Sequence, residues 1–134
     1  MERILVIGAN GQIGSELVEA LAEIHGEENV IAGDIGARSL AGAQRYETLD
    51  VLDSTRLAQV IDSNGITQVY QLAALLSVTG EQAPLRAWTL NMNGLLNILE
   101  IARERTASGK PLRVFWQSSI AAFGPHTPAV ETPQ

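Results

Sequence analysis

The chain opens with an apolar run that leads into three evenly spaced glycines. Ile4-Leu5-Val6-Ile7 precedes Gly8-Ala9-Asn10-Gly11-Gln12-Ile13-Gly14, and a helical pattern follows. A short, purely apolar run is typical of a strand buried on both faces, as in parallel sheets. A glycine-rich turn between such a strand and a helix lets backbone N–H groups approach a pyrophosphate, whose charge the helix dipole favours. The opening therefore predicts an α/β fold with a dinucleotide site at its first turn.

Short apolar runs and helical patterns alternate along the rest of the chain. We expect strands at 4–7, 29–32, 46–49, 69–72 and 114–116, and helices at 13–24, 54–63 and 84–105. Helices that cross between parallel strands indicate a doubly wound sheet. The prediction is a Rossmann-type parallel sheet that stops after about five strands, within one domain covering residues 1–134. Residues 36–45 are expected to form a loop, and the proline-containing tail to be irregular and mobile.

The helical patterns also predict which residues pack against the sheet. In the first helix the regularly spaced apolar residues are Ile13, Leu17, Leu21 and Ile24. In the long helix they are Leu85, Trp88, Met92, Leu95, Leu96, Leu99 and Ala102. Gly94 interrupts that helix at a cost of roughly 1 kcal/mol relative to alanine, so we expect close backbone packing there.

An acidic residue follows the second predicted strand. Asp34 lies twenty residues after Gly14, where a carboxylate can accept hydrogen bonds from the adenosine ribose hydroxyls. It would repel a 2′-phosphate, so the sequence predicts NAD rather than NADP. Three glycines alone are a weak signal, because any tight turn can use them and a surface acid is ordinary. The strand before them and Asp34 after them favour the cofactor site.

The composition narrows the range of partners. A formal net charge of −6, with lysine and arginine scattered singly, argues against binding to nucleic acid. The chain has no cysteine, which excludes disulfides, thiolate nucleophiles and cysteine-based zinc sites. The start runs directly into Ile4–Ile7 without a charged leader or a long apolar segment, so we expect a cytoplasmic protein with no membrane partner and no metal.

Four features together give the chain a resemblance to a known family. They are Gly8-x-x-Gly11-x-x-Gly14, Asp34, Asn91-Met92-Asn93-Gly94, and Phe115-Trp116-Gln117-Ser118-Ser119 followed by Phe123-Gly124. With them the whole chain resembles the extended short-chain dehydrogenase/reductases, which include nucleotide-sugar epimerases. The stretches 12–17, 75–81 and 122–125 are more similar to the short-chain type of L-threonine 3-dehydrogenase than to the epimerases.

The resemblance implies a role for each matching residue. The residues that would bind NAD are Gly8, Gly11, Gln12, Ile13 and Gly14 at the pyrophosphate, Asp34 and Ile35 at the adenosine ribose, Asp50 and Val51 beside the adenine, Leu72, Ala73 and Ala74 along the cofactor, and Asn91 as a support from the helix. Ser77 matches the serine of the family's substrate loop, and Ser119 matches its catalytic serine or threonine. Taken alone, both serines are also ordinary turn or cap residues, and an asparagine on a helix often bonds backbone carbonyls.

The chain departs from the family in its catalytic base. The resemblance predicts Tyr-x-x-x-Lys beyond the catalytic serine, because a nearby positive charge lowers the pKa of the phenol from about 10. The only lysine is Lys110, with Thr106 four residues before it, and the only tyrosines are Tyr46 and Tyr70. The chain therefore resembles the NAD-binding front part of such an enzyme, and we expect negligible activity from it alone.

Two alternative functions remain, together with one prediction about assembly. The alternatives are the NAD-binding part of a nucleotide-sugar epimerase or dehydratase, and a stand-alone NAD-binding module without catalysis. If the sheet ends at the strand 114–116, its open edge favours a homodimer or other self-association.

Overall fold

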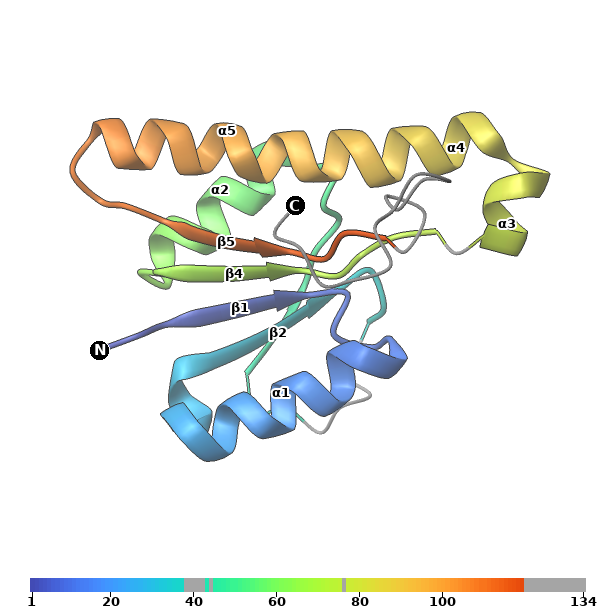
Figure 1. Cartoon of the computed structure of the whole chain (residues 1–134). Helices are drawn as coiled ribbons and strands as arrows, with labels where there is room; N and C mark the ends of the chain where they lie inside the picture. Colours follow the sequence, from blue (N-terminus) through green and yellow to red (C-terminus); the bar gives the residue numbers. More distant parts are fainter. Residues whose placement is uncertain (38–42, 44, 76, 120–134) are drawn as a thin grey trace, which may run out of the picture.

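A five-stranded parallel sheet forms the centre of the molecule. The computed structural model describes residues 1–37, 43, 45–75 and 77–119 (Figure 1). The strands are β1 (Ile4–Ile7), β2 (Val30–Asp34), β3 (Tyr46–Thr48), β4 (Gln68–Gln71) and β5 (Arg113–Trp116), in the order β3-β2-β1-β4-β5. Every neighbouring pair is parallel. The predicted Rossmann-type doubly wound sheet is confirmed.

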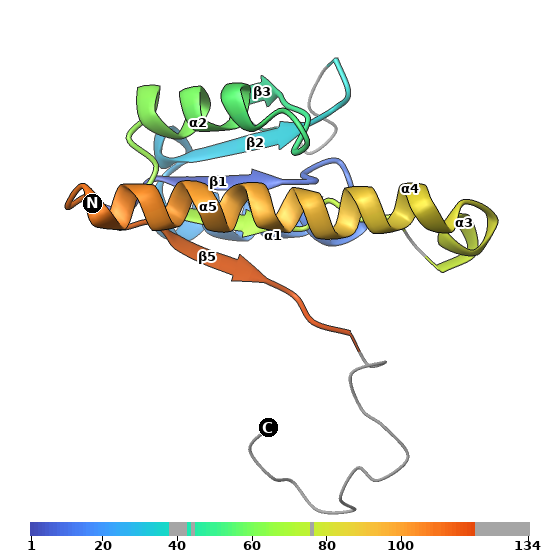
Figure 2. The ribbon, with the colours of Figure 1, turned by 90° about the horizontal axis from the view of Figure 1, so that it is seen from above.

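Helices cover the sheet on both faces. They are α1 (Gln12–His25), α2 (Ser54–Ser63), α3 (Ser77–Gln82), α4 (Pro84–Trp88) and α5 (Gly94–Ala107), with a 3-10 turn η1 (Glu27–Asn29) and a π-turn η2 (Thr89–Asn93). Figure 1 shows α1 on one face and α2 and α5 on the other, and Figure 2 shows α4 and α5 as one continuous rod. Sequence reasoning missed α3, which begins at Ser77, the residue that the resemblance assigns to a substrate loop.

Two apolar layers hold the helices on the sheet, because successive strand residues point to opposite faces. Ile4 and Val6 of β1 pack with Val18 of α1. Leu5 and Ile7 pack on the other face with the buried residues of α2 and α5. Each fully buried aliphatic side chain stabilises the fold by roughly 1.5–3 kcal/mol.

The predicted buried faces of two helices are partly wrong. In α1 the buried residues are Gly14, Val18 and Leu21, while Ile13 is 57% exposed and Ile24 is 74% exposed. In α5 the sheet-facing residues are Gly94, Ile98 and Ile101. In the long helix Leu85, Trp88, Leu96 and Leu99 are exposed. The long helix carries two apolar stripes with similar spacing, and the sequence pattern does not indicate which one meets the sheet.

Gly94 packs closely, as predicted. A Cβ atom there would lie 2.8 Å from Val51 Cγ1, so any larger residue at position 94 would require the Val51 side chain or the helix to shift. In the part of the chain that the structure describes, no helix has the length and apolar character needed to cross a membrane. The predictions for the loop 36–45 and for the tail, including Phe123-Gly124, fall mostly or wholly outside the described residues.

Candidate cofactor site

The glycine turn lies at the carboxyl end of β1 and joins it to α1. Gly8 has a φ of +82°, a conformation that side chains disfavour. Its N–H donates to the Gly33 carbonyl oxygen at 2.9 Å. A Cβ on Gly8 would lie 2.7 Å from the backbone nitrogen of Ala73, at the end of β4. The turn is therefore pressed against two neighbouring strands, and only glycine fits at position 8.

The first turn of α1 faces the same strand ends. Gly11 is the residue before α1, and no side chain forms a capping hydrogen bond with the N–H groups at the start of this helix. Gln12 and Ile13 are exposed at the helix start, while Gly14 is buried against the turn. The unpaired N–H groups of a helix start and the positive end of its dipole together favour an anionic ligand. This arrangement suits a pyrophosphate.

The Asp34 carboxylate is fixed beside the glycine turn by two backbone donors. Asn10 N donates to Asp34 Oδ2 at 2.9 Å, and Ile35 N donates to Asp34 Oδ1 at 2.8 Å. Each carboxylate oxygen can accept more than one hydrogen bond, so both retain capacity for ligand hydroxyls. The carboxylate is thus oriented before any ligand binds.

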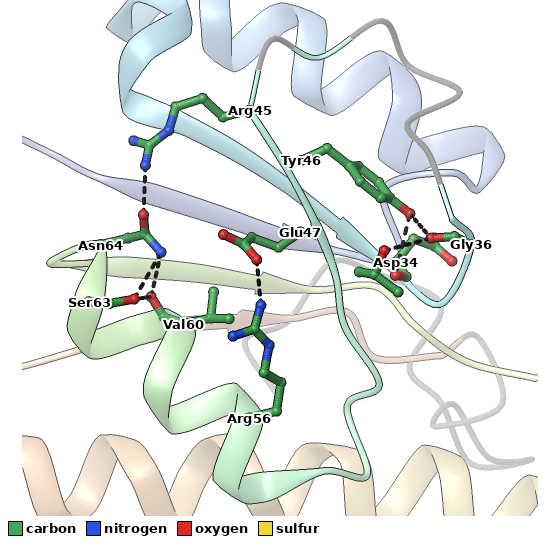
Figure 3. Close-up of polar contacts among 10 residues, drawn as sticks. Asp34, Gly36, Arg45, Tyr46, Glu47, Arg56, Val60, Ser63 and Asn64 are labelled. Carbon is green, nitrogen blue, oxygen red and sulfur yellow. Dashed lines mark hydrogen bonds and ion pairs between the residues drawn. The ribbon is translucent and has the colours of Figure 1, made fainter.

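Tyr46 closes the cluster around Asp34, as Figure 3 shows. Its hydroxyl donates to the Gly36 carbonyl at 2.7 Å and lies 3.3 Å from the Asp34 carbonyl oxygen. Asn10 Nδ2 donates to the same hydroxyl at 3.3 Å. Burial raises the pKa of Tyr46, and the nearby Asp34 charge adds to this, against the opposing effect of the Asn10 hydrogen bond. The neutral phenol therefore supports the backbone that follows Asp34.

These elements enclose a pocket of about 260 Å³ at the carboxyl ends of the strands. Its lining residues are Ile7, Gly8, Gly11, Asp34, Ile35, Leu49, Asp50, Val51, Leu72, Ala73, Ala74, Leu75 and Leu90. Ligands of open α/β sheets bind at such an edge. The volume lies below the roughly 300–1,000 Å³ of pockets that hold drug-sized ligands, so it suits one half of a dinucleotide.

The structure brings most of the predicted cofactor residues together. Nine of them line this pocket, and the roles assigned to them stay predictions. Gln12, Ile13 and Gly14 lie at the adjoining helix start instead. Asn91 does not line the pocket: its Oδ1 accepts from Leu75 N at 2.9 Å, so it holds one wall from behind.

The two predicted serines lie outside the pocket lining. Ser119 follows β5 and is exposed at the carboxyl side of the sheet. Ser77 is the first residue of α3, and its side chain lies outside the description. Their roles in substrate binding and catalysis stay predictions.

Sequence reasoning missed several residues that shape the pocket. Ile7, Leu49, Leu75 and Leu90 line it, and sequence reasoning gives none of them a role at the cofactor. Gln71 is 2% exposed, and its Nε2 donates to the Ala73 carbonyl at 3.0 Å, which fixes the backbone leaving β4. A polar residue at the end of an apolar strand was the available signal.

A second, more open groove of about 910 Å³ lies between α2 and α5. Polar side chains such as Thr55, Gln59 and Glu100 line it, and it lies away from the strand ends where the glycine turn and Asp34 meet. We therefore place the site at the smaller pocket. Among the described residues, no group of three or more His, Cys, Asp or Glu could hold a metal ion.

The chain is similar to a known family of proteins. Residues 4–134 match the NAD dependent epimerase/dehydratase family, and the chain is a member of it. An uncharacterised epimerase/dehydratase from Staphylococcus saprophyticus is 45% identical over 137 residues, covering 100% of this chain and 41% of that protein. The chain thus spans about two fifths of the length of this curated relative.

Two solved structures are similar to this chain in fold over most of its length. The holo form of an L-threonine dehydrogenase from Cupriavidus necator is 56% identical with a TM-score of 0.87, covering 98% of this chain and 42% of that one. A UDP-glucose 4-epimerase from Thermus thermophilus in complex with NAD is 28% identical with a TM-score of 0.69, covering 78% of this chain and 34% of that one.

The residues present fit the family's NAD cofactor. The pyrophosphate needs a close approach to backbone, and Gly8 and Gly11 provide it in a turn where a Cβ on Gly8 would overlap the backbone that follows β4. The uncapped start of α1 supplies N–H donors, and Asp34 supplies an oriented acceptor for ribose hydroxyls.

Proposed function

We propose that the chain is the NAD-binding part of a short-chain L-threonine 3-dehydrogenase, and that residues 1–134 form its incomplete Rossmann domain. The observation that carries the cofactor assignment is the pocket in which the glycine turn, Asp34 and Ala73 converge. The substrate assignment rests on similarity, because the chain is 56% identical to a threonine dehydrogenase and 28% identical to an epimerase of the same family.

Different residues of the pocket would bind different parts of the cofactor. The backbone of Gly8, Gly11 and the start of α1 would bind the pyrophosphate. Asp34 would accept from the adenosine ribose, and its negative charge would exclude a 2′-phosphate. Asp50 and Val51 would border the adenine. The lining includes Gly8, Gly11, Ala73 and Ala74, at which a ligand can approach the main chain.

The reaction of the whole enzyme would oxidise the β-hydroxyl of L-threonine to give 2-amino-3-oxobutyrate. When bound, NAD would supply the hydride acceptor, and the hydroxyl proton would pass to the tyrosine base that the family resemblance implies. Ser119 would hold the reacting hydroxyl by a hydrogen bond, and Ser77 would bind the amino acid. No Tyr-x-x-x-Lys sequence occurs in these 134 residues, so we expect negligible threonine-dependent NADH formation from the chain alone.

Calorimetric titration of the chain with NAD and then NADP tests the cofactor assignment. Saturable binding that prefers NAD supports the proposal. Asp34→Asn should weaken NAD binding by about tenfold, the value of one hydrogen bond to a charged group, and should narrow the preference over NADP. Glu19→Gln, an exposed acid on α1, is the control and should leave both unchanged. Failure of the folded wild-type chain to bind NAD would refute the assignment.

The epimerase or dehydratase function is the alternative, because the family and its Staphylococcus relative carry that description. A thermal-shift comparison on a full-length protein that contains this chain separates the two. Stabilisation by L-threonine in the presence of NAD supports the dehydrogenase, whereas stabilisation by a nucleotide sugar supports the alternative. Predictions of a cytoplasmic location and of no nucleic-acid or membrane partner accompany the proposal.

A further inference from the structure

One wall of the pocket is a short turn between β3 and α2. Asp50 and Val51 line the pocket from this turn. Leu52 N donates to Asp50 Oδ1 at 2.9 Å, and Asp53 N donates to the Asp50 carbonyl at 3.0 Å. These bonds shape the turn internally, and they leave the carbonyl groups of Val51 and Leu52 available to other partners.

Helix α5 holds this turn from behind. Asn97 Nδ2 donates to the Val51 carbonyl at 2.9 Å and lies 3.4 Å from the Leu52 carbonyl. Asn97 is half-buried and does not line the pocket. One helical turn earlier, Gly94 lets the helix backbone approach Val51 Cγ1 so closely that a Cβ would lie at 2.8 Å. Val51 is 2% exposed and therefore sits tightly between the helix and the pocket.

The same rod of helix holds the opposite wall. Asn91 Oδ1 accepts from Leu75 N, and Asn91 Nδ2 donates to the Leu75 carbonyl at 3.4 Å. Asn91 lies in the π-turn η2 and bonds the backbone that follows β4. Asn97 lies in α5 and bonds the backbone that follows β3. The separation of the two walls is thereby tied to one rigid element.

We propose that Asn97 is a positioning residue for the dinucleotide site. By fixing the Val51 and Leu52 carbonyls, it sets where Asp50 and Val51 stand and thus the affinity for the adenosine half of the ligand. The inference rests on the NAD site proposed above. Asn97 does not line the pocket, so it would act through the turn and not by contact with the ligand.

The test is calorimetric titration of the wild-type chain and of Asn97→Ala with NAD and with ADP-ribose, which lacks the nicotinamide. We expect the Kd of both ligands to rise by about 3- to 10-fold, the value of one net hydrogen bond. Asn93→Ala is the matched control, because Asn93 is exposed and makes no capping hydrogen bond. Asn97→Asp places a carboxylate oxygen beside the two carbonyl oxygens and repels them, so it should weaken binding at least as much as Asn97→Ala.

A second measurement separates positioning from a general loss of stability. Hydrogen exchange at the amides of residues 52 and 53 in the ligand-free chain should accelerate in Asn97→Ala and stay unchanged in Asn93→Ala. If Asn97→Ala lowers only the melting temperature while both Kd values and the exchange stay as in wild type, the inference is wrong and the proposed function stands. If the wild-type chain binds neither ligand, the proposed function and this inference fall together.

Discussion

Replacing Gly14 by alanine tests whether α1 is pressed against the glycine turn. A Cβ at this position would lie 2.8 Å from Ala9 Cα and closer still to the Gly8 carbonyl oxygen. Both atoms belong to backbone, so no side-chain rotation relieves the overlap. Either the start of α1 or the turn itself must move.

The structure lets two opposing effects be weighed. Overpacking against a fixed neighbour costs roughly 1–3 kcal/mol, and a backbone overlap falls at the upper end of that range. Alanine in a helix gains about 1 kcal/mol over glycine. The net loss in the free energy of unfolding is therefore about 2 kcal/mol, which lowers the melting temperature of a chain of this length by about 8 °C.

The assay is thermal and urea unfolding followed by circular dichroism, with Gly80→Ala as the matched control. Gly80 also lies in a helix, but a Cβ there would meet the Ala87 Cβ at an ordinary 3.4 Å. The control should be neutral or stabilised by up to about 1 kcal/mol. A Gly14→Ala variant as stable as wild type, with undiminished NAD binding, would refute the close contact between α1 and the turn.

Three further predictions concern titration and the open sheet edge. Because the pKa of Tyr46 is raised in the fold, its contribution to stability is present below pH about 10 and is lost as the pH rises through the folded value. In an ultraviolet titration, Tyr46→Phe should lose the highest-pH part of the tyrosinate absorbance, and a loss centred on the ordinary tyrosine pKa of about 10 would contradict the burial. Hydrogen bonds from Thr67 and Arg113 lower the pKa of Glu2, so the contribution of Glu2 to folding stability is lost as the pH falls below about 4.5. The melting temperature of Glu2→Gln should therefore fall less than that of the wild type between pH 6 and pH 3. Trp116 is 48% exposed on the edge strand β5, so sedimentation velocity should detect concentration-dependent association that Trp116→Lys reduces, and a monomer at all concentrations would oppose it.

The sequence predicts most of the sheet and the first turn because local chemistry determines them. Ile4–Ile7 has no polar residue to place in water, so a strand buried on both faces is its natural outcome. The glycine spacing indicates a turn whose close approach to Ala73 the structure shows. The buried face of the long helix is different, because Ile98 and Leu99 are both apolar and only packing against the sheet separates them.

The sequence predicts the parts of the pocket that are formed by main chain better than the residues outside the lining that hold this main chain in place. Glycines and alanines near strand ends mark places where a ligand can meet main chain, and four of the nine predicted residues that share the pocket are of these types. Asn97 and Gln71 act differently, since each bonds a carbonyl group in another segment or beyond its own strand end. The partner of Asn97 lies 46 residues away in the sequence and becomes visible only when the fold places α5 beside the turn after β3, whereas the partner of Gln71 lies two residues along the chain. If the position of the main chain determines the affinity of this site for NAD, that affinity should depend as strongly on the side-chain amides of Asn97 and Gln71 as on the side chains that line the pocket. Asn97→Ala is the variant that tests this.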